Sequence, residues 1–120
     1  MEWITKQHNG YAKKNDDVTI STTKDGKISI IFRNEVEKKI TRTGYIAIGI
    51  DTEHDRIYFR ESVAHEGYLI SRHSHSKARK VSGRTRLVNR ALTEALKGYK
   101  TDYKLNLDYQ RQMAYIELER

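Results

Sequence analysis

The chain has 120 residues and a formal net charge of +7, and this length suits a single domain, residues 1–120, with one modest core. The absence of cysteine excludes disulfides, thiolate zinc sites and cysteine nucleophiles, and it suits a reducing compartment such as the cytoplasm. No apolar run in the sequence approaches the roughly 18 to 20 residues that a membrane span needs, and the amino terminus lacks a secretory signal. We therefore expect a cytoplasmic protein without a membrane partner.

Alternating apolar residues predict β-hairpins along the chain, because successive side chains in a strand face opposite sides. The first contains Asp25 and Gly26, a pair that suits a tight turn because glycine tolerates positive φ angles. The second and third turn at 51–55 and 108–112. The predicted strand pairs are 18–20 with 28–30, 46–50 with 57–59, and 103–107 with 114–118. A further small hairpin around Asn9 and Gly10 is predicted on weaker alternation.

Two helices complete the expected elements. Phe32, Val36 and Ile40 recur every four residues, and Asn34 stands three places before Glu37, as in a capping box. A longer apolar stripe runs through 87–96 and ends at Gly98, which predicts a second helix with basic residues on its outer face. The sequence thus predicts an α+β fold of antiparallel β-hairpins with two short-to-medium helices.

The predicted elements suggest an internal repeat, with halves 18–61 and 68–119. Each half has the order strand, loop, helix, hairpin, which predicts one domain with pseudo-twofold symmetry. The second and third hairpins correspond at a separation of 57 positions. The matched pairs are Ile48 with Leu105, Ile50 with Leu107, Asp51 with Asp108, and Tyr58 with Tyr115.

The positive charge is concentrated in one segment. Residues 67–93 contain seven Lys and Arg residues and no Asp or Glu, whereas the two kinds of charge balance in the rest of the chain. Such a cluster predicts contacts with nucleic-acid phosphates, from a loop over 72–84 and from the start of the second helix; the alternative is a solvated loop. The seven are Arg72, Lys77, Arg79, Lys80, Arg84, Arg86 and Arg90.

The first half resembles the swapped-hairpin domains of the AbrB and MazE type. The resemblance rests on the strand 25–30, the helix 34–40, the motif Thr43-Gly44-Tyr45-Ile46 and the hairpin that ends at Phe59. The resemblance implies DNA binding by a β-barrel. Two chains usually complete this barrel, which implies a homodimer, whereas a duplicated chain could complete it alone. The resemblance also implies that three further cations lie near the DNA-facing edge, namely Lys24, Lys27 and Arg33.

The seven cations and the resemblance together indicate a nucleic-acid-binding module, with DNA favoured over RNA. The sequence leaves the choice between duplex and single strand open, because the basic segment itself contains no aromatic residue for base stacking. Tyr68 and Tyr99 flank it, and the tyrosines on or beside predicted strands fit core edges or cross-strand pairs better than base platforms. A second hypothesis is an inhibitor or adaptor that docks its basic face on an acidic or nucleic-acid-binding host protein, a kind common among small phage early proteins.

Other kinds of site have less support. His73 and His75 would point the same way on an extended segment and could hold a metal with His54 or His65, but the nearby cations repel a divalent ion. We interpret Asp51, Glu53 and Asp55 as turn acids that balance nearby arginines, since a helix-loop-helix calcium loop would want glycine and glutamate where Arg56 and Ser62 stand.

We find no nucleophile elbow and no phosphate-binding glycine loop in the sequence, and so expect no enzyme, cofactor or metal. A nuclease that uses His73 or His75 is the alternative that the histidines leave open.

Overall fold

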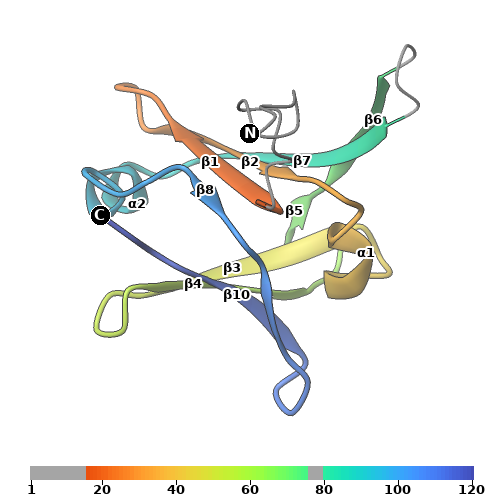
Figure 1. The fold of residues 1–120 in the computed structure, drawn as a ribbon. Coiled ribbons are helices and arrows are strands. Elements are labelled where there is room, and N and C mark those ends of the chain that lie inside the picture. Colours follow the sequence, from red (N-terminus) through yellow and green to blue (C-terminus); the bar gives the residue numbers. More distant parts are fainter. Residues whose placement is uncertain (1–15, 76–79) are drawn as a thin grey trace, which may run out of the picture.

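The computed structural model describes residues 16–75 and 80–120, which form two five-stranded antiparallel sheets with two short helices (Figure 1). The fold is therefore mostly β with α+β character, as the predicted hairpins and helices require. The hairpin predicted around Asn9 and Gly10 lies outside the described residues. Among the described helices none is long and apolar enough to cross a lipid bilayer.

The first sheet has the strand order β6-β7-β2-β1-β8, and the second has the order β5-β3-β4-β10-β9. The strands of the first sheet are β1 Val18–Thr22, β2 Lys27–Phe32, β6 Ser71–His75, β7 Lys80–Val88 and β8 Asp102–Tyr103. Those of the second are β3 Tyr45–Asp51, β4 Arg56–Glu61, β5 Tyr68–Leu69, β9 Asn106–Asp108 and β10 Met113–Glu117. The chain crosses between the sheets at both edges, because β5 leads into β6 and β8 leads towards β9.

The core lies between the two sheets, where the inward side chains of each layer meet. Phe32 of β2 and Phe59 of β4 pack edge to face with ring centroids 5.4 Å apart, so one aromatic pair joins the layers. Both side chains are fully buried. Among the strand residues whose burial the structure describes, the others below 2% exposure are Val18, Ile28, Ile30, Ile46, Ile57, Thr85, Ala114 and Ile116.

The first two predicted hairpins are confirmed. Strands β1 and β2 pair in antiparallel register around the Asp25–Gly26 turn, where Gly26 has φ +78°. Strands β3 and β4 pair around the polar turn at 51–55. The third hairpin is confirmed for β9 and β10, but its first strand does not begin at Tyr103. Tyr103 belongs to β8 and pairs with Val18 of the first sheet, because the chain changes sheets after it.

The first helix is shorter than predicted, and its proposed cap is wrong. Helix α1 spans only Glu37–Ile40, and Val36 at its N-cap makes no side-chain capping bond. Asn34 and Glu35 both have φ near +57°, which is incompatible with an α-helix, and Asn34 Nδ2 donates to Asp17 Oδ1 at 3.1 Å. Phe32 belongs to β2.

The second helix, α2, also begins later than predicted and spans Arg90–Ala95. Leu87 and Val88 end β7, because that strand pairs with β2 and takes up the apolar positions assigned to a helical stripe. The helix starts after Asn89, whose side chain accepts a hydrogen bond from Leu92 N at 2.9 Å. Gly98, with φ +82°, follows the helix as predicted.

The β3–β4 and β9–β10 hairpins have the same register at the separation of 57 positions. Gly49 pairs with Tyr58, and their counterparts Asn106 and Tyr115 pair in the same way. The two turns also match, since Asp55 and its counterpart Gln112 have φ +52° and +54°. A duplication of the whole chain is not confirmed by these matches and stays a prediction.

Thr85 provides a stability test of the core. Its hydroxyl is buried, with the residue 1% exposed, and has no hydrogen-bond partner within 16–75 and 80–120. Burying an unsatisfied hydroxyl is costly, so we expect Thr85→Val to raise the free energy of unfolding by about 1 kcal/mol, measured by chemical denaturation.

Thr93 is the matched control for this test. It is also buried, but its Oγ1 donates to the Asn89 carbonyl at 2.8 Å. Thr93→Val should therefore lower the free energy of unfolding by about 1 kcal/mol. If Thr85→Val lost as much stability as Thr93→Val, the conclusion that the buried Thr85 hydroxyl has no hydrogen-bond partner would be contradicted.

Candidate nucleic-acid interface

The outward face of the first sheet carries arginines of β7. Thr85 and Leu87 are buried against the second sheet, so Arg84 and Arg86, which alternate with them, lie on the outer side. Arg86 is exposed and stands opposite Ser29 of β2, while the partly exposed Arg84 stands opposite Ile31. Both arginines precede α2, but the prediction that Arg86 lies on the second helix is wrong, because it pairs with β2 and α2 begins only at Arg90.

The Asp25–Gly26 turn lies against the start of α2. The Asn89 N–H donates to the Gly26 carbonyl at 2.9 Å. A Cβ added to Gly26 would lie 2.7 Å from Arg90 Cγ, so both the positive φ and this close approach require glycine. The contact brings Lys24 and Lys27, on either side of the turn, to the end of the sheet where Arg90 lies.

Five cations of this region form what we call the basic face: Lys24, Lys27, Arg84, Arg86 and Arg90. They come from the β1–β2 turn, β2, β7 and α2. None of the five makes an ion pair within the described part of the chain. Within the described residues, their charges are therefore not neutralised by an ion pair.

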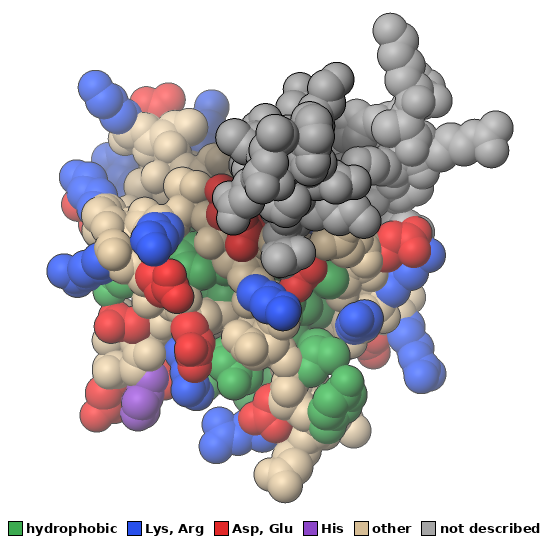
Figure 2. Space-filling model, viewed as in Figure 1, with side chains coloured by type: hydrophobic (Ala, Val, Ile, Leu, Met, Phe, Trp, Pro, Cys, Tyr) green, Lys and Arg blue, Asp and Glu red, His purple; other side chains and the backbone are tan. Residues whose placement is uncertain are grey.

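Many cations elsewhere are already paired with acids. Lys38 lies 3.2 Å from Glu35, Arg56 lies 3.1 Å from Glu117, and Lys97 Nζ lies 3.1 Å from Glu94. Figure 2 shows blue and red side chains side by side over much of the visible surface. The basic face differs from these pairs because none of its five cations lies within ion-pair distance of an acid among the described residues, although the exposed Asp25 lies in the same turn as Lys24.

The other predicted contact residues are placed differently. Arg33 lies beyond the far end of β2, where its guanidinium is 3.7 Å from Asp102 Oδ1 and also donates to Thr19 Oγ1. Arg72 is on β6, opposite Gly83, and Lys80 begins β7, opposite His75. Lys77 and Arg79 lie outside the described residues.

The predicted loop over 72–84 is instead a β-hairpin. Strands β6 and β7 pair from Ser71–Arg84 to His75–Lys80, so only residues 76–79 stand between them. The sequence predicted a loop because this segment consists mainly of serines, histidines and cations and has no apolar face. The backbone pairing with β7, which is itself held by β2, makes the segment a strand. In Figure 1 the pair extends beyond the body of the two sheets.

The histidines considered as metal ligands are distributed over separate elements. His73 and His75 lie on β6 of the first sheet, whereas His54 is in the β3–β4 turn and His65 follows β4. Among the described residues, the only group of metal-ligand type consists of Asp51, Glu53 and His54, with ligand atoms within 4.8 Å of one another.

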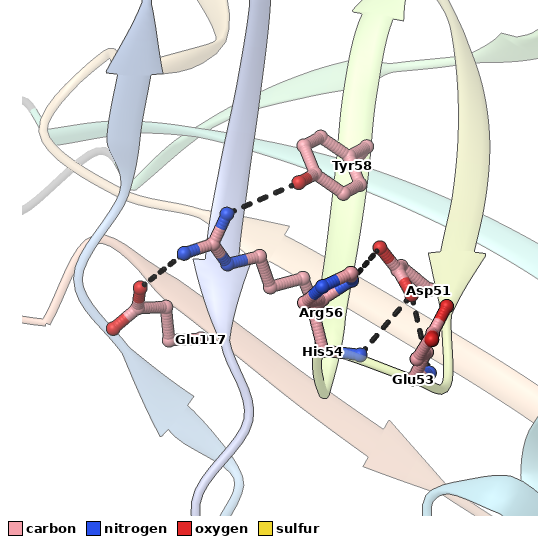
Figure 3. Close-up of polar contacts among 6 residues, drawn as sticks. All are labelled: Asp51, Glu53, His54, Arg56, Tyr58 and Glu117. Atoms are coloured by element: carbon pink, nitrogen blue, oxygen red, sulfur yellow. Dashed lines mark hydrogen bonds and ion pairs between the residues drawn. The ribbon is translucent and has the colours of Figure 1, made fainter.

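These three residues build the β3–β4 turn (Figure 3). Asp51 Oδ1 accepts from the backbone N–H groups of Glu53 and His54, both at 3.1 Å, and Asp51 Oδ2 lies 2.8 Å from His54 Nδ1. The predicted role of Asp51 as a turn acid is consistent with these bonds, but its side-chain partner is His54. The Arg56 guanidinium reaches Glu117 Oε1 at 3.1 Å and the Tyr58 hydroxyl at 3.3 Å.

The hydrogen bond from His54 lowers the pKa of Asp51 below 3.8. A carboxyl with a depressed pKa stabilises the fold above its unfolded pKa and loses this contribution as pH falls through the folded value. We therefore expect the Asp51 carboxyl carbon to titrate below 3.8 in an NMR experiment. In His54→Ala the midpoint should rise; an unchanged midpoint would contradict the role of the imidazole.

The tyrosines considered for base stacking include one cross-strand pair on the outer face of the second sheet. Tyr58 and Tyr115 are direct partners with ring centroids 5.6 Å apart, and the Arg56 guanidinium lies 4.8 Å from the Tyr115 ring centroid. Tyr103 is buried, and burial raises its pKa. The most exposed described tyrosine is Tyr109, at 83%, in the β9–β10 turn.

Sequence reasoning missed how the two sets of predicted contacts combine. The concentration of charge selected Arg84, Arg86 and Arg90, and the resemblance selected Lys24 and Lys27. In the structure all five lie around the β2–β7 ladder and the adjoining β1–β2 turn. The Asp25–Gly26 turn was the one sequence feature that pointed to this arrangement. Its contact with Asn89 could not be predicted, because it joins residues far apart in the chain.

The described residues define a two-sheet antiparallel β protein with a surface of five cations that form no ion pair among themselves and the other residues described. Comparison of the chain with known protein families, curated proteins and solved structures finds no match.

Proposed function

We propose that this protein is a nucleic-acid-binding module that contacts DNA phosphates through the basic face. The observation that carries the proposal is the gathering of five cations from separate elements without an acid partner in the described part of the chain. Phosphate binding to such a surface releases condensed counterions and does not break existing ion pairs. The function is electrostatic positioning, with no catalytic step.

The arrangement of strands supports the further proposal of a duplicated unit of the AbrB and MazE type within one chain. The order β6-β7-β2-β1 is symmetric about the β7–β2 pair, and β3-β4-β10-β9 is symmetric about β4–β10. The outer strands of the first sheet differ in register, because Val18 pairs with Phe32 whereas its counterpart His75 pairs with Lys80. Such an order arises when two hairpin units meet through equivalent strands. In this proposal one chain supplies both halves of the DNA-binding unit, and a homodimer is not required.

The test is a fluorescence anisotropy titration of labelled DNA with the full chain at several salt concentrations. If all five cations contact duplex phosphates, the logarithm of the association constant should fall with the logarithm of salt at a slope of about −4.5. The proposal fails if neither duplex nor single strand binds with a salt dependence. An acidic protein partner for the same surface would then be the remaining hypothesis.

A further inference from the structure

The correspondence at 57 positions extends, without a gap, into the strands that carry the basic face. Residues 26–33 read GKISIIFR, and residues 83–90 read GRTRLVNR. Glycine and arginine are identical at the two ends, and Lys27 matches Arg84. Ile28 and Ile30 match the inward positions of Thr85 and Leu87, all of them buried. The two strands are therefore equivalent in face as well as in sequence position.

The two central strand pairs place a common symmetry axis. In the first sheet Ser29 of β2 pairs with Arg86 of β7, and in the second Tyr58 of β4 pairs with Tyr115 of β10. Each of these pairs joins residues that are 57 positions apart. A residue that lies opposite its own counterpart in an antiparallel ladder marks the twofold axis, so one pseudo-twofold axis passes through both pairs.

This axis relates the cations of the basic face to one another. Lys27 on β2 and Arg84 on β7 are counterparts that lie on opposite sides of the Ser29–Arg86 pair. Arg84 stands opposite Ile31, so the two cations are four residues apart along the strand direction and lie on adjacent strands. Strand geometry gives a separation of about 14 Å between their Cα atoms. Arg86, which is exposed, lies between them at the axis.

We propose that the ligand of the basic face is double-stranded DNA, bound with its own local twofold axis on the pseudo-twofold axis at Arg86; this inference rests on the proposed function. The two strands of a duplex are related by such axes, and binding proteins with twofold symmetry exploit them. The major groove is about 12 Å wide, so Lys27 and Arg84 can reach phosphates on its two sides. Arg86 then faces the groove.

The two halves of this surface differ in free charge. At the Gly26 end, Lys24, Lys27 and Arg90 have no ion pair among the described residues, whereas near the other end Arg33, the counterpart of Arg90, lies 3.7 Å from Asp102. A single-stranded ligand needs only the Gly26 end. A duplex engages both ends, so loss of either Lys27 or Arg84 should weaken its binding.

The test compares a labelled 20-base-pair duplex with its isolated strand in anisotropy titrations of the full chain and its variants. We expect the duplex to bind at least about tenfold more tightly. Lys27→Gln and Arg84→Gln should each weaken duplex binding by about three- to tenfold, equal within about twofold, and lower the salt slope by about 1. Arg60→Gln, an exposed cation of the second sheet, is the control and should have little effect.

Three outcomes would overturn the inference or its basis. Equal affinity for duplex and single strand, or a loss of affinity in only one of the two variants, overturns the duplex assignment and leaves the proposed nucleic-acid binding intact. Absence of any salt-dependent binding by the parent chain overturns the proposed function as well. Circular dichroism melting of each variant ensures that a lost affinity does not come from unfolding.

Discussion

Phe59→Ala should lower the free energy of unfolding by about 3 to 5 kcal/mol, the range observed when a buried phenylalanine is truncated. Phe59 is fully buried and packs edge to face on Phe32 of the opposite sheet. Truncation therefore removes apolar burial and the aromatic contact between the layers, and leaves a cavity that the flanking β strands cannot close. Equilibrium denaturation in urea measures the change.

Val63→Ala is the control for this substitution, because Val63 is 43% exposed outside the strands. It should change the free energy of unfolding by less than about 0.5 kcal/mol. If Phe59→Ala cost less than about 1 kcal/mol, the two sheets would not share the core described here.

The triple variant Lys27→Gln, Arg86→Gln and Arg90→Gln should weaken DNA binding roughly 100-fold at 50 mM salt and lower the salt slope by about 2.7. Three phosphate contacts are lost together, which accounts for both effects. Glutamine keeps most of each side-chain stem, including the part of Arg90 that lies against Gly26. Anisotropy titration of the same duplex at several salt concentrations measures both quantities.

A matched triple variant separates position from total charge. Lys39→Gln, Arg60→Gln and Lys104→Gln remove the same number of charges from exposed cations outside the basic face. This control variant should bind DNA nearly as tightly as the parent chain. Equal losses in the two triple variants would mean that net charge alone attracts the DNA and that the basic face is not a specific contact surface.

The hairpins could be predicted because their signals are local. Alternation of apolar residues and the Asp25–Gly26 turn each involve neighbours in the chain, and they place β1 to β4 correctly. The helices were predicted less well for the same reason. Residues 87 and 88 fit a helical stripe locally, but hydrogen bonds to β2, some sixty residues away, make them a strand.

The candidate site was predictable in its residues and not in its shape. The acid-free segment selected Arg84, Arg86 and Arg90, and the resemblance added Lys24 and Lys27. The resemblance also selected Arg33, but Asp102 lies beside its guanidinium, so Arg33 is already paired with an acid. Nothing in the local sequence indicates that pairing, because Asp102 reaches Arg33 only through the pairing of β8 with β1.

The sequence alone therefore determined the strand periodicity, the tight turns, the concentration of charge and the spacing of 57 positions, all of which are properties of residues in order. The tertiary structure decided which strands are neighbours and which face each cation occupies. These depend on backbone hydrogen bonds and core packing between distant segments, such as the Ser29–Arg86 pair and the contact of Asn89 with Gly26. The basic face exists only through those long-range contacts.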